Sequence, residues 1–156
     1  MNASGAYVLF EAGGEPLAAT AAAIDAIHDE LPIQEIEGTK RWFLGLAVAN
    51  GRLLPTTDLG LLLGKRASSG RILQLHSDVG IAGLRVDTVY GLRDSVTCET
   101  LAGDGDDAHP AISSQVVRDE GRLHRVLDFV ALLQSPEFVD IALDATESIA
   151  RPICLD

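Results

Sequence analysis

The stretch Gly51-Arg52-Leu53-Leu54-Pro55-Thr56-Thr57-Asp58-Leu59-Gly60-Leu61-Leu62-Leu63 returns seventy residues later as Gly121-Arg122-Leu123-His124-Arg125-Val126-Leu127-Asp128-Phe129-Val130-Ala131-Leu132-Leu133. Six positions are identical at the same spacing: the Gly-Arg-Leu opening, the Asp seven residues after the glycine, and the closing Leu-Leu pair. An internal repeat is the most informative feature for the architecture, because each copy of the repeat corresponds to one structural unit. Each copy predicts a turn, a strand and a short helix that begins after the aspartate.

A fainter repeat lies earlier in each half of the chain. Ile24-Asp25-Ala26-Ile27 matches Val86-Asp87-Thr88-Val89, sixty-two residues further on. Each segment follows an expected hairpin, over residues 7–20 in the first case and 71–86 in the second. Two matches in the same order indicate that the chain contains two copies of one unit.

Local signals divide each copy into short strands. Asn50-Gly51 is a dipeptide that suits the positive φ angles of a type I′ turn, so it predicts a hairpin between residues 43–49 and 52–57. Asp58 and Asp128 stand where helix N-caps belong, because a carboxylate can accept unpaired backbone N–H groups. Residues 21–28 suit a short helix or a bent edge segment. The other expected strands cover 7–10, 15–20, 71–76, 79–86, 91–99, 112–118 and 122–127.

The regular spacing of short strands and glycine-bearing turns predicts a mainly β protein of two small barrels with short helices. At 156 residues the chain is long enough to bury a real core. We expect one domain over residues 1–142, made of two repeated barrel subdomains over 6–66 and 67–140, with exchange of strands between them left open. Residues 143–156 form a C-terminal tail with no clear period.

Composition excludes several classes of function. A net charge of −11, with scattered lysines and arginines, argues against a nucleic-acid partner, which requires clustered positive charge. No apolar run approaches the ~20 residues of a membrane-spanning helix, and no basic region precedes residues 7–10, as it would in a signal peptide. Cys98 and Cys154 lie in dissimilar contexts, so no disulfide framework is expected. We expect a cytoplasmic protein without direct membrane insertion.

The chain offers no convergent metal-binding groups. Its four histidines lie apart in the sequence, at His28, His76, His109 and His124, without a recognised metal spacing. Asp104, Asp106 and Asp107 superficially resemble a calcium loop. The twelfth position counted from Asp104 is Gln115, where such a loop needs a bidentate Glu. We therefore expect no metal and no cofactor.

A catalytic reading of the two repeated aspartates is the weakest hypothesis. Asp58 and Asp128 could act as a carboxylate pair in a hydrolase. Each repeats the same helix-start environment, however, and two structural caps explain them better than one catalytic pair. We expect that the protein is not an enzyme.

Two segments resemble the CheW-like domain. Residues 42–59, Trp42-Phe43-Leu44-Gly45-Leu46-Ala47-Val48-Ala49-Asn50-Gly51-Arg52-Leu53-Leu54-Pro55-Thr56-Thr57-Asp58-Leu59, follow the family pattern of an apolar-Gly strand, N-x-R-G, three residues, Pro, two residues and Asp-Leu. Residues 79–89 resemble the family's G-x-x-V-D-x-V strand and turn. The resemblance covers about residues 6–134. The ending at residues 132–138 is similar to PilI-type members, which serve type IV pilus (twitching) chemosensory systems.

The resemblance implies two five-stranded SH3-like barrels and a non-catalytic adaptor. Such adaptors bridge the cytoplasmic tip of a methyl-accepting chemoreceptor and the regulatory domain of a CheA-type histidine kinase in chemotaxis or pilus signalling. The family's N-x-R-G falls on residues 48–51, so Asn50 replaces the arginine that contributes to receptor contact. From this transfer we expect receptor-facing residues at Ile24, Val48 and Asn50, and kinase-facing residues at Val86, Val89 and Leu92.

One alternative from another class stays open. The chain has more apolar residues than two small barrels can bury, and exposed apolar patches mark binding surfaces. Barrel mouths and grooves between barrels also hold small ligands. A small-molecule-binding β-barrel protein is therefore the alternative function.

Overall fold

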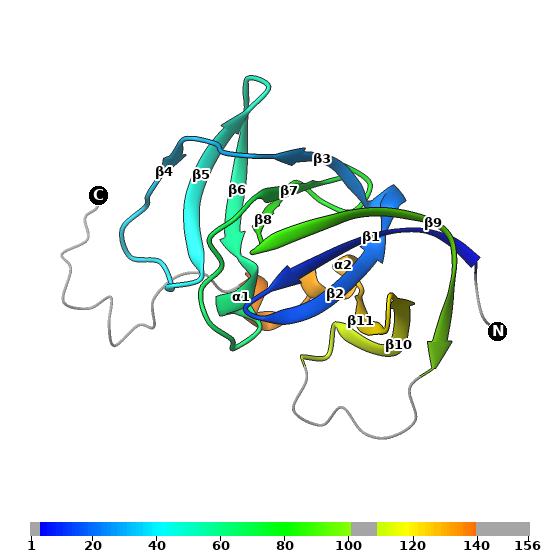
Figure 1. Cartoon of the computed structure of the whole chain (residues 1–156). Helices are drawn as coiled ribbons and strands as arrows, with labels where there is room; N and C mark the ends of the chain where they lie inside the picture. The colour runs from blue at the N-terminus through cyan, green and yellow to red at the C-terminus, as the bar shows by residue number, and fades with distance from the viewer. Residues whose placement is uncertain (1–3, 101–108, 140–156) are drawn as a thin grey trace.

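The computed structural model describes residues 4–100 and 109–139, in which strands dominate (Figure 1). The mainly β fold class is confirmed. The expected tail at 143–156 and the three aspartates at 104, 106 and 107 lie outside the described residues.

The strands form two sheets. One is a closed barrel in the order β1-β2-β11-β10-β9, and the other is a six-stranded sheet in the order β3-β7-β8-β6-β5-β4. The barrel strands are β1 (Ser4–Ala12), β2 (Glu15–Thr20), β9 (Thr88–Thr100), β10 (Ile112–Asp119) and β11 (Arg122–Leu127). The sheet strands are β3 (Ile24–His28), β4 (Ile33–Gln34), β5 (Phe43–Ala49), β6 (Arg52–Asp58), β7 (Ile72–Leu75) and β8 (Gly83–Arg85). The short helices are η1 (Ala21–Ala23), α1 (Leu59–Leu62), α2 (Phe129–Leu133) and α3 (Pro136–Val139).

Each sheet takes strands from both halves of the chain. The barrel combines the first hairpin, β1–β2, with β9, β10 and β11, whereas the six-stranded sheet combines β7 and β8 with four strands of the first half. The two halves join through the parallel pairs β2 with β11 and β6 with β8, and through the antiparallel pairs β1 with β9 and β3 with β7. The boundaries 6–66 and 67–140 therefore do not each enclose one sheet. The two halves exchange their N-terminal hairpins, as the sequence analysis left open.

The fainter repeat explains why the sheets differ by one strand. In the second half, β9 pairs with β1 and, at its far end, with β10, and so closes the barrel; in Figure 1 it runs beside β1. In the first half the equivalent segment is broken, so that β3 pairs with β7 and β4 pairs with β5. The break falls over residues 29–32 and ends at Pro32, which has no N–H for a ladder. Six strands therefore replace the expected five, and this sheet stays open.

Both repeated hairpins turn through two residues with positive φ. Asn50 has φ 52° and Gly51 has φ 77°, which agrees with the predicted type I′ turn. Glu120 (φ 49°) and Gly121 (φ 81°) take the same form in the second copy. Asparagine tolerates this conformation better than most residues, which gives Asn50 a structural reason independent of any partner.

Two other expected elements differ in detail. Residues 21–28 combine both predicted alternatives, since the short η1 turn leads directly into β3 at the edge of the sheet. The strand expected over 79–86 contracts to β8, because residues 77–79 form a turn.

The exchanged hairpins pack against each other in one core that both sheets share. Along β1, Val8 and Phe10 point into this shared core, whereas Tyr7 and Leu9 point into the barrel. Phe10 also stacks on Phe129 of α2, with ring centroids 6.5 Å apart. The buried residues of the shared core are Val8, Phe10, Ala12, Leu17, Ala19, Leu59, Leu62, Leu73, Leu75, Ala82, Leu84, Val86, Ala111, Leu127, Phe129 and Leu132.

Both predicted caps are present, but their surroundings differ. The Asp58 carboxylate is only 2% exposed and accepts the N–H groups of Leu61 and Ser68, each at 3.0 Å. Asp128 is exposed and accepts the N–H groups of Val130 and Ala131 at 3.0 and 3.2 Å. Asp58 thus caps α1 and also fixes the backbone at Ser68, ten residues further along the chain.

The hairpin exchange predicts that the two halves cannot fold alone. Residues 1–66 and 67–156, produced as separate chains, each lack the hairpin that completes their sheet and half of the shared core. We expect each fragment alone to show no cooperative thermal transition by circular dichroism, and a mixture of the two to regain one. The intact chain is the control. A fragment that melts cooperatively by itself would contradict the exchange.

The two caps should differ in their contribution to stability. Asp128→Ala should lower the free energy of unfolding by about 1 kcal/mol, the usual effect of removing an exposed cap. Asp58→Ala should cost about 3 kcal/mol, because it also leaves the buried N–H of Ser68 without a partner. Urea denaturation of both variants measures the difference. Equal losses would show that the contact with Ser68 contributes nothing.

Candidate interaction surfaces

The three residues expected to face a receptor do not share one surface. Val48 is exposed on the outer side of β5, and Asn50 is exposed at the tip of the β5–β6 hairpin. Ile24 instead is half-buried at the start of β3 and packs against the shared core. Ile24 therefore offers little area to a partner, while Val48 and Asn50 are accessible.

The structure adds two apolar residues to this end of the sheet. Val48, Leu53 and Ile81 are 49%, 62% and 69% exposed. Val48 and Leu53 are opposite each other on β5 and β6, and Leu53 lines a hollow of about 160 Å³ together with Ile81. We call these three residues the hairpin-tip patch. Leu53 belongs to the repeated Gly-Arg-Leu motif, but the motif does not reveal which leucines stay exposed.

The three residues expected to face a kinase also separate. Val86 is 0% exposed within the shared core, so it cannot contact a partner and its assignment is wrong. It falls where the chain passes between the sheets, a position that is buried from both sides. Val89, on β9, is half-buried and, like Ile24, packs against the shared core, although it also lines a groove. Leu92, on the same strand, is 55% exposed. We call Val89 and Leu92 the β9 surface.

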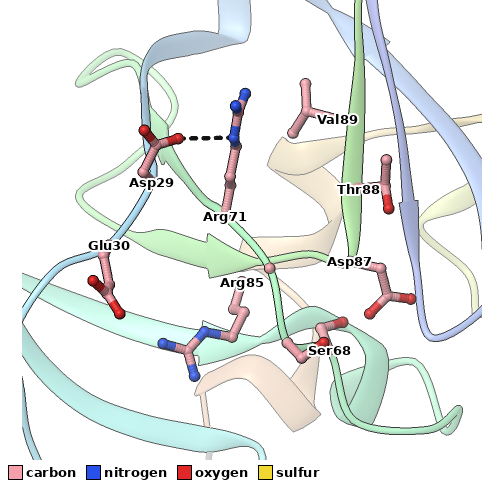
Figure 2. A pocket seen from close by; sticks show the side chains of 10 residues that line it. Asp29, Glu30, Ser68, Arg71, Arg85, Asp87, Thr88 and Val89 are labelled. Carbon is pink, nitrogen blue, oxygen red and sulfur yellow. Dashed lines mark ion pairs between the residues drawn. The ribbon is translucent and has the colours of Figure 1, made fainter.

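A groove of about 540 Å³ lies where the chain crosses from β8 to β9, beside Val89 (Figure 2). We call it the crossover groove. Three stretches of chain form it: the break after β3, the approach to β7, and the crossing itself. The residues that line it are Asp29, Glu30, Ser68, Ser69, Gly70, Arg71, Arg85, Asp87, Thr88 and Val89.

Close backbone packing fixes the shape of the crossover groove. The N–H of Gly70 donates to the carbonyl of Val86 at 2.7 Å, and a Cβ on Gly70 would come within 2.1 Å of the carbonyl oxygen of Asp87. Only glycine fits at this contact. Ser68 lies two residues before Gly70. It donates its backbone N–H to the carboxylate of Asp58, which caps α1. The repeated aspartate of the first half therefore supports the wall of the groove.

Some charged side chains of the crossover groove have partners within the described part of the chain, and Arg85 does not. Arg71 pairs with Asp29 at 2.9 Å, the contact marked in Figure 2. The carboxylate of Asp87 accepts the N–H of Gly14 at 3.1 Å. Arg85, the last residue of β8, has a buried Nε atom without a hydrogen-bond partner.

A second groove, of about 630 Å³, borders the other crossing, between β2 and β3. Its walls include Ala22 and Ala23 from that crossing, Val79 from the β7–β8 turn, and Phe129 and Val130 from α2. It is more apolar than the crossover groove. Both crossings of the exchanged hairpins therefore leave a concave surface between the sheets.

Polar side chains on the barrel mostly satisfy one another. The hydroxyl of Tyr90 donates to Glu11 at 2.5 Å and accepts from Arg122 at 2.8 Å, and the hydrogen bond with Glu11 raises the pKa of Tyr90. Arg93 pairs with Asp119 at 3.1 Å. Across residues 4–100 and 109–139, His, Cys, Asp and Glu side chains form no group of three or more that could hold a metal ion.

His124 is buried beside this polar network. Its Nδ1 lies 3.3 Å from the carbonyl oxygen of Leu17, and its ring meets Tyr90 edge-on with centroids 5.7 Å apart. Burial lowers the pKa of His124, and the nearby Arg122 acts in the same direction. His124 is thus a neutral core histidine.

The depressed pKa of His124 predicts a loss of stability in acid. The unfolded chain takes up the proton more readily than the folded one, so the folded state weakens as the pH falls below about 6.5. His124→Gln should show a smaller fall in melting temperature between pH 7 and pH 5 than the wild type. His76→Gln, just before the β7–β8 turn, is the control for the substitution of histidine by glutamine. Identical pH dependence in all three proteins would refute the role of His124.

Comparison with known proteins agrees with this geometry. Residues 6–137 match the family described as the CheW-like domain. The chain belongs to the CheW-like family. Members of this family are non-catalytic, so the expectation that the chain is not an enzyme is confirmed.

Two relatives illustrate the similarity. The chain is 36% identical to Protein PilI of Pseudomonas aeruginosa (strain PAO1) over 89 residues, which are 54% of this chain and 49% of PilI. The match therefore spans about half the length of that curated relative. The scaffolding protein TtCheW from Thermoanaerobacter tengcongensis has the same fold, with a TM-score of 0.69 at 18% identity over 86% of this chain and 96% of that one. No helix in the described part of this CheW-like chain has the length and apolar character needed to cross a membrane.

Proposed function

We propose that this CheW-like protein is a cytoplasmic adaptor that couples a chemoreceptor to a CheA-type histidine kinase. The receptor contributes its methyl-accepting cytoplasmic tip, and the kinase its regulatory domain. The similarity to PilI favours a type IV pilus chemosensory pathway. The observation that carries the proposal is the presence of two separate exposed apolar surfaces on one continuous core.

An adaptor must hold two partners at once without contributing chemistry. The hairpin-tip patch lies on the six-stranded sheet and the β9 surface lies on the barrel, as Figure 1 lets the reader follow. The shared core joins the two sheets, so a partner on one surface is fixed relative to a partner on the other. We assign the hairpin-tip patch with Asn50 to the receptor and the β9 surface to the kinase.

The small-molecule alternative has less support. The barrel interior is filled by Tyr7, Leu9, Ala18, Cys98 and Val117, which are all buried. The thiol of Cys98 and the hydroxyl of Tyr7 form a hydrogen bond at 3.0 Å. That hydrogen bond, together with burial, raises the pKa of Tyr7 to about 12. The two grooves of about 540 and 630 Å³ lie between the sheets, where protein partners can also reach them.

Paired charge substitutions test the assignment of surfaces. Leu53→Asp should weaken receptor binding at least tenfold and leave kinase affinity unchanged, because an unpaired carboxylate in an apolar contact is costly. Leu92→Asp should do the reverse. Both side chains are mostly exposed, so neither variant should unfold. Isothermal calorimetry with a receptor signalling fragment and the kinase regulatory domain measures both. If the wild type binds neither partner, the adaptor function is wrong.

Restoring the family arginine gives a second test. Asn50→Arg supplies a guanidinium fork that asparagine cannot reproduce, so receptor affinity should rise while kinase affinity stays the same. The positive φ at this position should lower stability by about 1 kcal/mol. Calorimetry and thermal melting separate these two effects. Unchanged receptor affinity would place the receptor contact away from the hairpin tip.

A further inference from the structure

Arg85 is a half-buried cation without a partner. Its Nε atom is buried and makes no hydrogen bond, and no ion pair joins its guanidinium to any described residue. Burying a hydrogen-bond donor without a partner costs free energy. A residue that served only to pack this position would be more favourable as an apolar side chain. The guanidinium of Arg85 is therefore available to a group outside the folded chain.

The other charged groups around Arg85 are already engaged or turned away. Asp29 is paired with Arg71, and Asp87 accepts the N–H of Gly14. In Figure 2 the guanidinium of Arg85 points away from the Asp29–Arg71 pair, on the side of the groove where Glu30 lies. Glu30 lines the same groove, but no ion pair forms between it and Arg85. The crossover groove thus holds one guanidinium whose donors the described part of the chain does not use.

The walls of the groove indicate what kind of group it accepts. Arginine presents several N–H donors in a planar fork that matches a carboxylate. Ser69 is exposed beside it and can add a hydroxyl, while Val89 offers an apolar wall and is itself part of the β9 surface. The crossover groove therefore fits a protein segment in which an acidic side chain is followed by an apolar one.

We propose that Arg85 binds a carboxylate side chain of the protein that docks on the β9 surface. This inference rests on the proposed function, which identifies that protein as the kinase regulatory domain. The carboxylate enters the crossover groove and takes up the free donors of Arg85, while its apolar neighbour packs on Val89. Arg85 then determines specificity for an acidic residue in the partner.

The chain provides a matched control for this role. Arg125 on β11 is also half-buried with a buried, unpartnered Nε, but it does not line the crossover groove. Arg85→Met and Arg125→Met therefore remove the same kind of group from different places. Both variants should melt at or above the wild-type temperature, since each relieves an unsatisfied donor. Melting confirms that any loss of binding does not come from unfolding.

Calorimetry of the full chain with the kinase regulatory domain tests the proposal. Arg85→Met should weaken binding roughly 30-fold or more, the effect of removing one side of a desolvated charge pair. Arg85→Lys should recover only part of the affinity, because it keeps the charge and loses the fork. Arg125→Met should bind as the wild type does. Binding of the wild type should also weaken more steeply with salt than binding of Arg85→Met.

The outcomes distinguish failure of the Arg85 contact from failure of the adaptor function. If the wild type binds the kinase domain and Arg85→Met binds equally well, the role of Arg85 is wrong and the adaptor function stands. If Arg85→Met loses affinity for a receptor fragment and keeps it for the kinase, the proposed source of the carboxylate is wrong. If the wild type does not bind the kinase domain at all, both the adaptor function and this inference fall.

Discussion

The exchange of hairpins between the two halves is the constraint on which the rest of the structure depends. Because β1–β2 completes the sheet that contains β10 and β11, its outer face meets β7 and β8 across the shared core. Residues on β1 are buried on both faces for this reason, which explains the uninterrupted apolar run at residues 7–10. The crossings that the exchange requires also create the two grooves between the sheets.

Much of the fold could be predicted because its signals are local or repeated. The turn at Asn50-Gly51 and the caps at Asp58 and Asp128 depend on residues close in sequence, and the structure has all three. The partner of each hairpin could not be predicted in the same way. The sheet that β1–β2 joins is decided by long-range pairing of β1 with β9 and of β2 with β11, which local sequence pattern does not encode.

The sequence also predicted the exposure of some residues of the proposed interaction surfaces correctly, and that of others wrongly. Val48 and Leu92 are exposed as expected, but Val86, two positions before β9, is fully buried. Sequence pattern cannot separate these valines and leucines, because a strand buried on both faces loses the alternation that marks a surface. No sequence pattern marked Arg85 as a functional residue. A single arginine in a strand is ordinary until the structure shows that its buried Nε has no hydrogen-bond partner.

The break in the strand equivalent to β9 has a consequence for motion. The barrel has no free edge, so its amides can exchange with solvent only when the whole ladder opens. Residues 29–32 lack ladder partners, and the short β4 beyond them pairs along only two residues of β5. Local opening therefore starts at this margin, with little disturbance of the interior. Asp29 and Glu30, which form one side of the crossover groove, lie on that margin. The exposed Asp29–Arg71 ion pair ties this wall to the opposite one, which is anchored through Ser68 to Asp58. The width of the groove therefore depends on one solvent-exposed ion pair.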